Sequence, residues 1–355
     1  VREKYRFNQY KDPRTMNKKY QNKKITMAHG SGGKASSDLI KDIFVDTFNN
    51  DYLATMEDQA RFEMPKGRLA LTTDSFVVSP LFFKGGDIGK LAVTGTVNDL
   101  AVSGAKPLYL TCGLILEEGL PIATLDKIIK SMQKTAEEAG VKIVCGDTKV
   151  VEKGSADQIF INTAGVGVID EGIEVHSYQA QTGDKIIVNG FIGDHGAAIM
   201  QSRAELAISA DIASDCQVLN HLVEKILSVS NNIHAMRDAT RGGVATVLNE
   251  IANDSKVSII IKEDSLPVRT PTRGVCEILG LDPLYLANEG TLVCVVAAID
   301  ADKVLATMQQ TKEGKDACII GTVTNHPEGI VALSTLFGGT KIIDKLIGDQ
   351  LPRIC

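Results

Sequence analysis

Residues 125–145 read LDKIIKSMQKTAEEAGVKIVC, and this stretch decides the fold class. Apolar residues recur at every third or fourth position between Leu125 and Ala139, which predicts an amphipathic helix. Gly140 follows, a residue that commonly ends helices because it adopts the left-handed conformation. The apolar run 141–145 then predicts a strand. Helix and strand alternate outward from here in both directions, so we expect a mixed α and β protein, of the α+β or α/β class.

The chain has 355 residues, a length that favours two domains. The periodicity lapses around residues 172–183, where we place the boundary between them. We therefore predict a basic, disordered extension over 1–26, an N-terminal ATP-binding and dimerisation domain over 27–172, a C-terminal α/β domain over 173–335, and a mobile tail over 336–355.

Composition narrows the class of function and the compartment. The net charge of −6 argues against a nucleic-acid partner bound through its phosphates. No run of apolar residues is long enough to span a membrane, and no secretory signal is evident. The seven cysteines contain no CxxC pair. We therefore expect a cytoplasmic protein without a disulfide framework or a zinc ribbon.

Several acidic residues share one local setting, at the end of a predicted element or in a glycine-rich turn. Their oxygens, without a cluster of His or Cys, suit Mg²⁺ better than zinc. Together with glycine turns at 30–33 and 85–89 they suggest a site for a magnesium nucleotide. Taken singly, each residue is more often a turn former or a helix cap. The residues are Asp58, Asp74, Asp99, Asp147 and Asp238.

A glycine-rich loop at 29–34, HGSGGK, precedes a predicted helix over 35–48. Its backbone N–H groups and Lys34 could surround a phosphate. The spacing is not that of a Walker A loop. A flexible linker explains the same residues equally well.

Two residues stand out as candidates for proton transfer. Lys149 follows a predicted polar turn at the end of a strand, and Glu289 precedes a strongly apolar strand. Either side chain could be partly desolvated, with a perturbed pKa. The ordinary interpretations are a solvated charge for Lys149 and a turn residue for Glu289.

The last five residues, 351–355, end in a free thiol at Cys355. A chain end is usually mobile unless it is held. Such an end carrying a nucleophile could act as a swinging arm that visits more than one site, and Pro352 would stiffen its base. From its position alone, a cysteine without special function is the simpler interpretation.

Together these motifs resemble the HypE family of hydrogenase maturation factors. The interior motifs alone resemble the wider superfamily of ATP-dependent enzymes similar to aminoimidazole ribonucleotide synthetase (PurM-like), and the cysteine-terminated tail singles out HypE. The resemblance covers the chain from about residue 27 to its end. The matching stretches are His29–Lys34, Thr73–Gly89, Asn98–Ala105, Cys145–Val151, Asp238–Gly243 and Pro352–Cys355.

The resemblance implies a homodimer whose N-terminal strands pair across the two copies as a β-barrel, with ATP and Mg²⁺ in a cleft. A carbamoyltransferase, HypF, would load a carbamoyl group onto Cys355. ATP-dependent dehydration would then convert it to a thiocyanate, and the cyano group would pass to iron held by HypC and HypD for [NiFe]-hydrogenase. Phosphorylation of the carbamoyl oxygen would make it a leaving group.

The same resemblance implies roles for individual residues. Glu289 would accept the first proton from the carbamoyl nitrogen, and Lys149 would relay protons or stabilise charge. The predicted metal ligands are Asp58, Asp74 and Asp99. The predicted contacts to nucleotide are Lys34, Asp58, Asp74, Asn98, Asp99, Asp147 and Asp238.

Two other classes of function stay open at this point. One is another enzyme of the same superfamily, such as selenophosphate synthetase or aminoimidazole ribonucleotide synthetase. Selenophosphate synthetase is disfavoured because the first cysteine, Cys112, lies far past the glycine loop. The other is a carrier without catalytic activity, which would need Cys355 but not the acidic residues.

Overall fold

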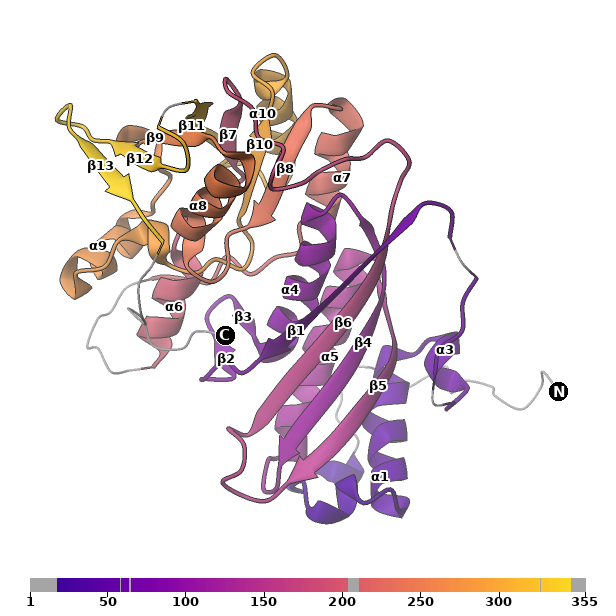
Figure 1. Ribbon diagram of the computed structural model, residues 1–355. Coiled ribbons are helices and arrows are strands. Elements are labelled where there is room, and N and C mark those ends of the chain that lie inside the picture. The colour runs from indigo at the N-terminus through magenta and orange to yellow at the C-terminus, as the bar shows by residue number, and fades with distance from the viewer. Residues whose placement is uncertain (1–17, 58, 64, 204–210, 326, 346–355) are drawn as a thin grey trace.

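The computed structural model describes residues 18–57, 59–63, 65–203, 211–325 and 327–345. These residues form two large sheets, one in each half of the sequence, and a small two-stranded sheet (Figure 1). The first sheet has four strands in the order β1-β6-β4-β5, and the second has seven in the order β13-β12-β9-β11-β7-β10-β8. The mixed α and β class that the sequence predicts is confirmed.

The N-terminal sheet is covered by helices on one face only. Its strands are β1 (Arg68–Phe76), β4 (Lys106–Glu117), β5 (Lys142–Val151) and β6 (Ile159–Ile169). The helices α4 (Ile88–Val102) and α5 (Ile122–Ala139) pack on the covered face (Figure 1). Strand β6 is antiparallel to both β1 and β4, whereas β4 and β5 are parallel. The other face, which we call the open face, has no helix on it among the described residues.

The helix predicted around residue 125 is α5. Its apolar stripe, which includes Leu125, Ile128 and Ile129, is buried. Gly140 ends the helix with φ 72°, as the sequence predicts. Strand β5 follows at Lys142, but it continues to Val151 instead of stopping at residue 145. The predicted polar turn at 146–149 is therefore wrong, because pairing with β4 satisfies this backbone and the open face accepts its polar side chains.

Short helical elements precede the first sheet. They are η1 (Lys18–Tyr20), η2 (Met27–Gly30), α1 (Lys34–Leu39), the π-helical η3 (Ile40–Val45), α2 (Asp46–Phe48) and α3 (Asp51–Ala54). Tyr20 and Ile25 are buried in the core, and Lys19 forms ion pairs with Asp38 and Asp42. The predicted disordered extension over 1–26 is therefore wrong for its last part, where apolar side chains tie the backbone to the domain. Residues 1–17 lie outside the described part.

The C-terminal sheet has helices on both faces. Its strands are β7 (Lys185–Val188), β8 (Ile233–Asp238), β9 (Ser258–Lys262), β10 (Leu292–Val296), β11 (Cys318–Thr324), β12 (Val331–Ser334) and β13 (Thr340–Ile343). Helix α8 (Gly243–Ser255) packs on one face, and α7 (Asn220–Val229) and α10 (Ala301–Gln309) pack on the other. Helices α6 (Asp194–Ser202) and α9 (Thr270–Leu279) form a smaller cluster beside it.

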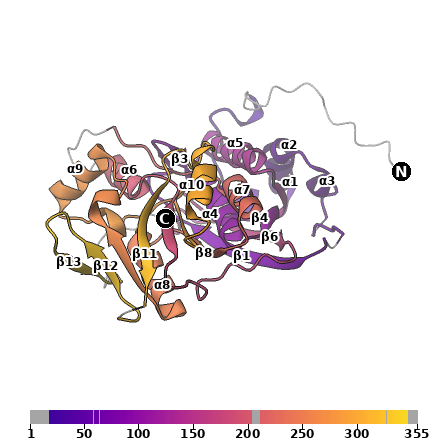
Figure 2. The ribbon, with the colours of Figure 1, turned by 90° about the horizontal axis from the view of Figure 1, so that it is seen from above.

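Helix α4 joins the two domains, and Figure 2 shows it between them. It is buried almost all round, as expected of a helix that is apolar on every face. Asp87 caps its first turn by accepting hydrogen bonds from the backbone of Gly89 and Lys90. Ala101 and Val102, at its other end, pack into the core that α7 shares with the C-terminal sheet. Residues of α4 can therefore face both domains.

The predicted mobile tail over 336–355 begins too early. Strand β13 pairs with β12, and Ile343 is fully buried, so the C-terminal domain continues past residue 335. Residues 346–355, with Cys355, lie outside the described part. The small hairpin β2 (Phe82–Phe83) and β3 (Gly86–Asp87) completes the fold. None of the described helices is both long and apolar enough to cross a membrane.

Candidate active site

A cluster of carboxylates lies where the two domains meet. Asp74 sits within β1, on the helix-covered face of the sheet, opposite Thr163 of β6. Asp99 comes from the facing side of α4. Thr72 donates a hydrogen bond to Asp99 at 2.8 Å, and Thr96 donates to Asp74 at 3.4 Å. Asp74 is therefore inside a strand, not at its end as the sequence predicts, but the strand does bring it to Asp99.

The C-terminal domain contributes two more acids to this cluster. Asp238 ends β8, and Glu289 precedes β10, the strand that pairs with β8. A backbone hydrogen bond of 2.8 Å from Ala239 to Thr291 holds the two strand ends together. Only 4% of Glu289 is exposed. The simpler interpretation from the sequence, a turn residue at the surface, is therefore wrong for Glu289, because the turn that carries it leads into the fully buried strand β10.

Burial and mutual repulsion raise the pKa of three carboxyl groups in this cluster. Burial raises the pKa of Asp74 to about 6, and the charge of Asp99 adds to the effect. Burial raises the pKa of Asp238 to about 7, helped by Asp99 and Asp74. Burial likewise raises the pKa of Glu289 well above its usual range, with contributions from Asp215, Asp238, Asp74 and Asp99. Arg241 opposes the shift at Asp74. The positive charges near the cluster do not balance the carboxylates enough to cancel these upward pKa shifts.

This imbalance predicts that the site destabilises the ligand-free protein. An acid with a raised pKa in the folded state makes its full contribution to stability below the unfolded pKa, and that contribution is lost as the pH rises through the folded pKa. For Asp238 this window runs from about 4 to about 7. We expect Asp238→Asn to raise the free energy of unfolding by about 1–3 kcal/mol at pH 7.5, and to flatten its decline across the window.

Thermal and urea unfolding at pH 5 and pH 7.5, without nucleotide or Mg²⁺, measure this effect. Asp157→Asn is the matched control, because Asp157 is exposed and remote from the cluster. A loss of stability in Asp238→Asn at pH 7.5 would contradict the prediction.

The backbone around Glu289 is held by a second carboxylate, Asp215. Its oxygens accept hydrogen bonds from the backbone N–H groups of Glu289 and Gly290, both at 3.0 Å, and from the hydroxyl of Thr291 at 2.9 Å. Burial raises the pKa of Asp215 to about 6. Nothing in the sequence marks Asp215, since it lies in a loop without a strand or glycine motif beside it.

Asn98 fastens the same backbone from the side of α4. Its amide donates to the carbonyl oxygens of Gln217 and Glu289, at 3.1 and 3.4 Å, and accepts from the N–H of Leu219 at 2.8 Å. The buried side chain thus crosslinks the two domains. Both ends of the amide thus have protein partners, and the contact of Asn98 with a nucleotide stays a prediction.

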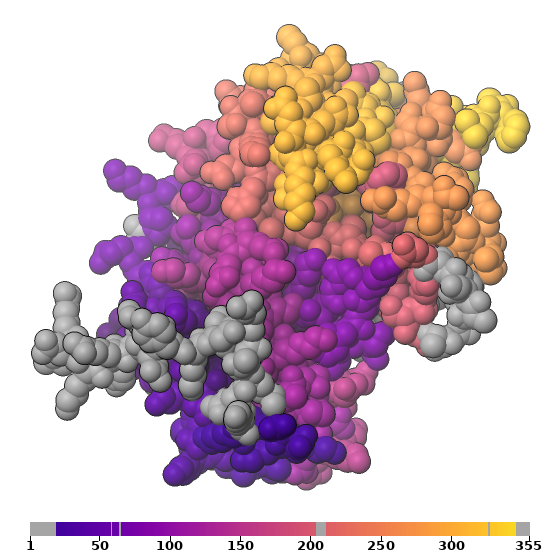
Figure 3. Space-filling model, turned by 180° about the vertical axis from the view of Figure 1, so that it is seen from behind, coloured from indigo at the N-terminus to yellow at the C-terminus, as the bar shows by residue number. Residues whose placement is uncertain are grey.

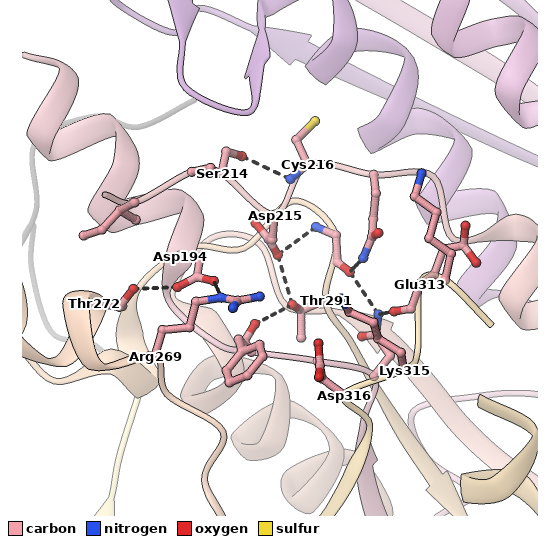
Figure 4. A pocket seen from close by; sticks show the side chains of 18 of the residues that line it. Asp194, Ser214, Asp215, Cys216, Arg269, Thr272, Thr291, Glu313, Lys315 and Asp316 are labelled. Carbon is pink, nitrogen blue, oxygen red and sulfur yellow. Dashed lines mark hydrogen bonds and ion pairs between the residues drawn. The ribbon is translucent and has the colours of Figure 1, made fainter. Parts of the chain in front are cut away.

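Behind the Glu289 turn lies a pocket of about 680 Å³ (Figure 4). Asp215, Gly290 and Thr291 line this pocket, whereas Glu289 is not among its lining residues. Arg269 stacks on Phe191 and pairs with Asp194 at 2.8 Å across one side. The pocket therefore has charged and polar side chains in its lining, and it borders the turn that carries Glu289.

Lys149 and Asp147 do not join the cluster within one chain. Both lie in β5 on the open face and are exposed, and they form an ion pair with each other at 3.0 Å. The solvated charge that the sequence favoured for Lys149 is confirmed within one chain, because no element of the described residues covers its side chain. Strand β5 is also three strand spacings from β1, about 14 Å.

The glycine loop lies near β5 as well. A side chain at Gly30 would meet Val150 at 2.8 Å, so the loop packs directly against the strand that carries Lys149. Lys34 is exposed at the start of α1. The predicted site residues thus form two groups, one at the domain junction and one at the β5 edge. Asp58 and Cys355 lie outside the described residues.

The donor set at the junction fits Mg²⁺ bound together with phosphates. Mg²⁺ in such sites usually takes one or two carboxylates, several waters and phosphate oxygens. Asp99 is close enough to Asp74 to help raise the pKa of Asp74, an effect that a divalent cation would reverse. Among the described residues no group of three His, Cys, Asp or Glu side chains could by itself hold a metal ion. The junction is therefore not a metal cage made of protein alone.

Comparisons with known proteins agree with this architecture. The model of the AIR synthase related protein, N-terminal domain, matches residues 56–169, and that of the C-terminal domain matches residues 181–334. These matches define the class as AIR synthase related proteins with two α/β domains. The predicted PurM-like fold is confirmed to that extent.

Relatives and solved structures narrow the class. Carbamoyl dehydratase HypE of Azotobacter vinelandii is 49% identical over 334 residues, which cover 94% of this chain and 98% of the relative. A crystal structure of hydrogenase maturation protein HypE in complex with ATP superposes with a TM-score of 0.89 at 47% identity, covering 93% of this chain and 99% of that one. The chain belongs to the HypE family.

A further solved structure is that of a HypE-HypF complex. Its matching chain is 51% identical, with a TM-score of 0.77, and the match covers 87% of this chain and 99% of that one. Membership of the HypE family disfavours the other enzymes of the superfamily that the sequence left open.

Proposed function

We propose that this protein is an ATP-dependent carbamoyl dehydratase that converts a carbamoyl group on the sulfur of Cys355 to a thiocyanate. The buried carboxyl of Glu289 beside an uncompensated acidic cluster is the observation that carries the proposal. A proton acceptor next to a site for Mg²⁺ and phosphate is what this dehydration needs. The names of the relatives and the solved complex with ATP support the same reaction.

The reaction balances without a redox partner. The carbon–oxygen bond of the carbamoyl group breaks, and both protons leave its nitrogen as the carbon–nitrogen triple bond forms. ATP supplies the phosphoryl group that turns the carbamoyl oxygen into a phosphate leaving group. Glu289 accepts one nitrogen proton, for which its carboxyl must be ionised, and the departing phosphate takes the other. Asp74, Asp99 and the predicted ligand Asp58 would hold Mg²⁺, which offsets the charge on the phosphates.

Intact-mass measurement of the C-terminal peptide tests the proposal directly. A chain carbamoylated on Cys355 is expected to lose the mass of one water on incubation with Mg²⁺ and ATP, with ATP consumed in step. A carrier without catalytic activity would keep its carbamoyl mass and consume no ATP. That outcome would reject the dehydratase and leave the carrier function.

The open face of the N-terminal sheet supports the proposed homodimer. Leu71 is 76% exposed there and Leu69 is 51% exposed, and both belong to the edge strand β1. Ile115 of β4 adds to the same face. If two copies packed their open faces together, these side chains would be buried. Pairing between the edge strands of the two sheets would then close the eight strands into a barrel. Lys149 would then be covered too, and could reach a site that the partner copy helps to form.

We expect Leu71→Asp to convert the dimer to a monomer, because it would bury a charge in the interface. Analytical ultracentrifugation gives the mass in solution, and circular dichroism checks that the variant still folds. Ile299→Asp is the control, since Ile299 is 87% exposed on the other domain and should leave the dimer intact. A monomeric wild-type chain, or a dimeric Leu71→Asp, would contradict this interface.

The proposed function also implies two partners and a compartment. HypF would load Cys355, in line with the solved HypE-HypF complex. The HypC and HypD proteins would receive the cyano group on their iron, and the whole sequence of steps would take place in the cytoplasm. Lys34, Asp147 and Asp238 remain proposed contacts to the nucleotide.

A further inference from the structure

Four exposed apolar side chains lie on the strands at one edge of the C-terminal sheet and on the turn that joins two of them. Ile260 of β9 and Ile342 of β13 lie in one cross-strand row, on either side of Ala332 of β12. Leu336 and Phe337 occupy the turn between β12 and β13. Their exposed fractions are 41% for Ile260, 64% for Ile342, 66% for Leu336 and 98% for Phe337. We call these four residues the hairpin patch.

The hairpin patch is where this domain concentrates its exposed apolar surface. Among the described residues from 181 onward, six large apolar side chains are exposed, and four of them belong to the patch. Single exposed apolar residues are ordinary, but a contiguous group marks an interaction site. The turn between β12 and β13 projects from the body, as Figure 3 shows in yellow at the upper right. The proposed dimer interface, on the other domain, does not account for this surface.

The sheet is also unfinished at this end. Strand β13 is the last in the order, so no strand of the described chain lies along its outer side. The edge is short, with residues 340–342 exposed and Ile343 buried. Polar side chains of Lys262 and Ser334 border the apolar row. An apolar centre with a polar rim and an available strand edge is the usual composition of a protein docking surface.

The position of the hairpin patch along the chain indicates which partner it fits. Strand β13 is followed at once by the segment that leads to Cys355. The carbonyl of Asp344 accepts a hydrogen bond of 2.9 Å from Tyr285, which fixes where this segment leaves the domain. Cys355 is ten residues beyond Lys345, so its sulfur can be at most about 35 Å away. A partner that loads the thiol must place its active site within that radius of Lys345, and a docking surface on the adjoining hairpin satisfies this condition.

We propose that the hairpin patch is the docking surface for the carbamoyl-transferring partner, with Phe337 as its central anchor. This inference rests on the proposed function, in which HypF loads Cys355. Exposed aromatic side chains at interfaces carry a large share of the binding energy when a partner pocket buries them. A partner bound to the hairpin is close to the point where the chain leaves the domain after Ile343. This raises the local concentration of the thiol at the partner's active site.

The test compares Phe337→Ser with Ile299→Ser. The second variant is the control, because it also replaces an exposed apolar side chain of the same domain by serine, but outside the hairpin patch. Both are assayed with purified HypF of the same species, by calorimetric titration for binding and by intact mass for carbamoyl transfer to Cys355. We expect Phe337→Ser to weaken HypF binding about 30-fold or more, and to slow transfer at low HypF concentration. Ile299→Ser should match the wild type in both.

A second measurement separates this proposal from the proposed function. Phe337→Ser that has been carbamoylated at saturating HypF should dehydrate its carbamoyl group at the wild-type rate with Mg²⁺ and ATP. Wild-type HypF affinity in Phe337→Ser would overturn the docking surface and leave the dehydratase intact. The docking surface would also be overturned if Phe337→Ser bound HypF normally but bound HypC and HypD more weakly, or if it lost self-association and kept its affinity for HypF. Failure of dehydration in the wild type would instead reject the proposed function.

Discussion

Replacing Glu289 by glutamine is expected to lower the rate of dehydration by about 10²- to 10⁴-fold, the usual contribution of a positioned base. Glutamine keeps the size and hydrogen-bonding shape of the side chain but cannot accept a proton. Glu289 is only 4% exposed, so a base from the solvent cannot easily replace it. Lys149, the other candidate for proton transfer, lies on the open face. The affinity for ATP should stay near that of the wild type, since the phosphate-binding carboxylates are unchanged.

The environment of Glu289 also sets the direction of the pH dependence. Burial and the neighbouring charges of Asp215 and Asp238 raise its pKa well above its usual range. The base works only when ionised, so the rate should rise with pH and be lost as the pH falls through the raised pKa. Bound Mg²⁺ would move this rise to lower pH, because positive charge favours the carboxylate.

Single-turnover conversion of carbamoylated protein, followed by intact mass from pH 6 to 9, measures both effects. Glu224→Gln is the control, because Glu224 is exposed on α7 and away from the cluster. Glu289→Gln should unfold at a temperature no lower than the wild type, since it removes a buried acid, so that lost activity cannot be ascribed to unfolding. Conversion at the wild-type rate would reject Glu289 as the base.

Replacing Gly290 by alanine is expected to have the largest effect on stability. A side chain there would lie 2.0 Å from the backbone oxygen of Asp215 and 2.6 Å from Gln217, which is closer than atoms can approach. The loop that carries Asp215 would have to move, and the hydrogen bonds that Asp215 accepts from 289 and 290 would break. We expect a loss of about 3 kcal/mol, or about 5–10 °C in the melting temperature.

Gly190→Ala is the matched control for this change. Gly190 lines the same pocket, but a side chain there would meet no atom within 4 Å. Differential scanning fluorimetry of both variants gives the comparison. An equal melting temperature for Gly290→Ala and the wild type would show that the Asp215 loop yields without cost, and that this contact does not position Glu289.

Local sequence patterns predicted helices and strands well where the spacing of apolar residues alone specifies which face of the element is buried. The helix over 125–139 and its end at Gly140 are examples, since one apolar stripe and one glycine suffice to specify them. The same reasoning failed at Gly146–Lys149. Polar residues usually mark a turn, but here a neighbouring strand supplies backbone partners and the open face accommodates the side chains. That information is not local.

The candidate site shows the same division. Residue type and setting were enough to select Asp74, Asp99, Asp238 and Glu289, and the fold brings all four to one junction. Asp215 could not be found, because its role depends on hydrogen bonds to a backbone 74 residues away in sequence. The hydrogen bonds by which Asn98 joins the two domains could not be found either, since they depend on the packing of α4 against residues 217–219.

The sequence by itself determined the class of fold, the supply of carboxylates and the presence of a cysteine at 355, because these depend on local periodicity and residue chemistry. Only the tertiary structure decided which of these groups meet. The alternation of side chains along β1 and β5 sends Asp74 to the domain junction and Lys149 to the open face. Burial at that junction, which no stretch of sequence contains alone, is what raises the proton affinity of Glu289.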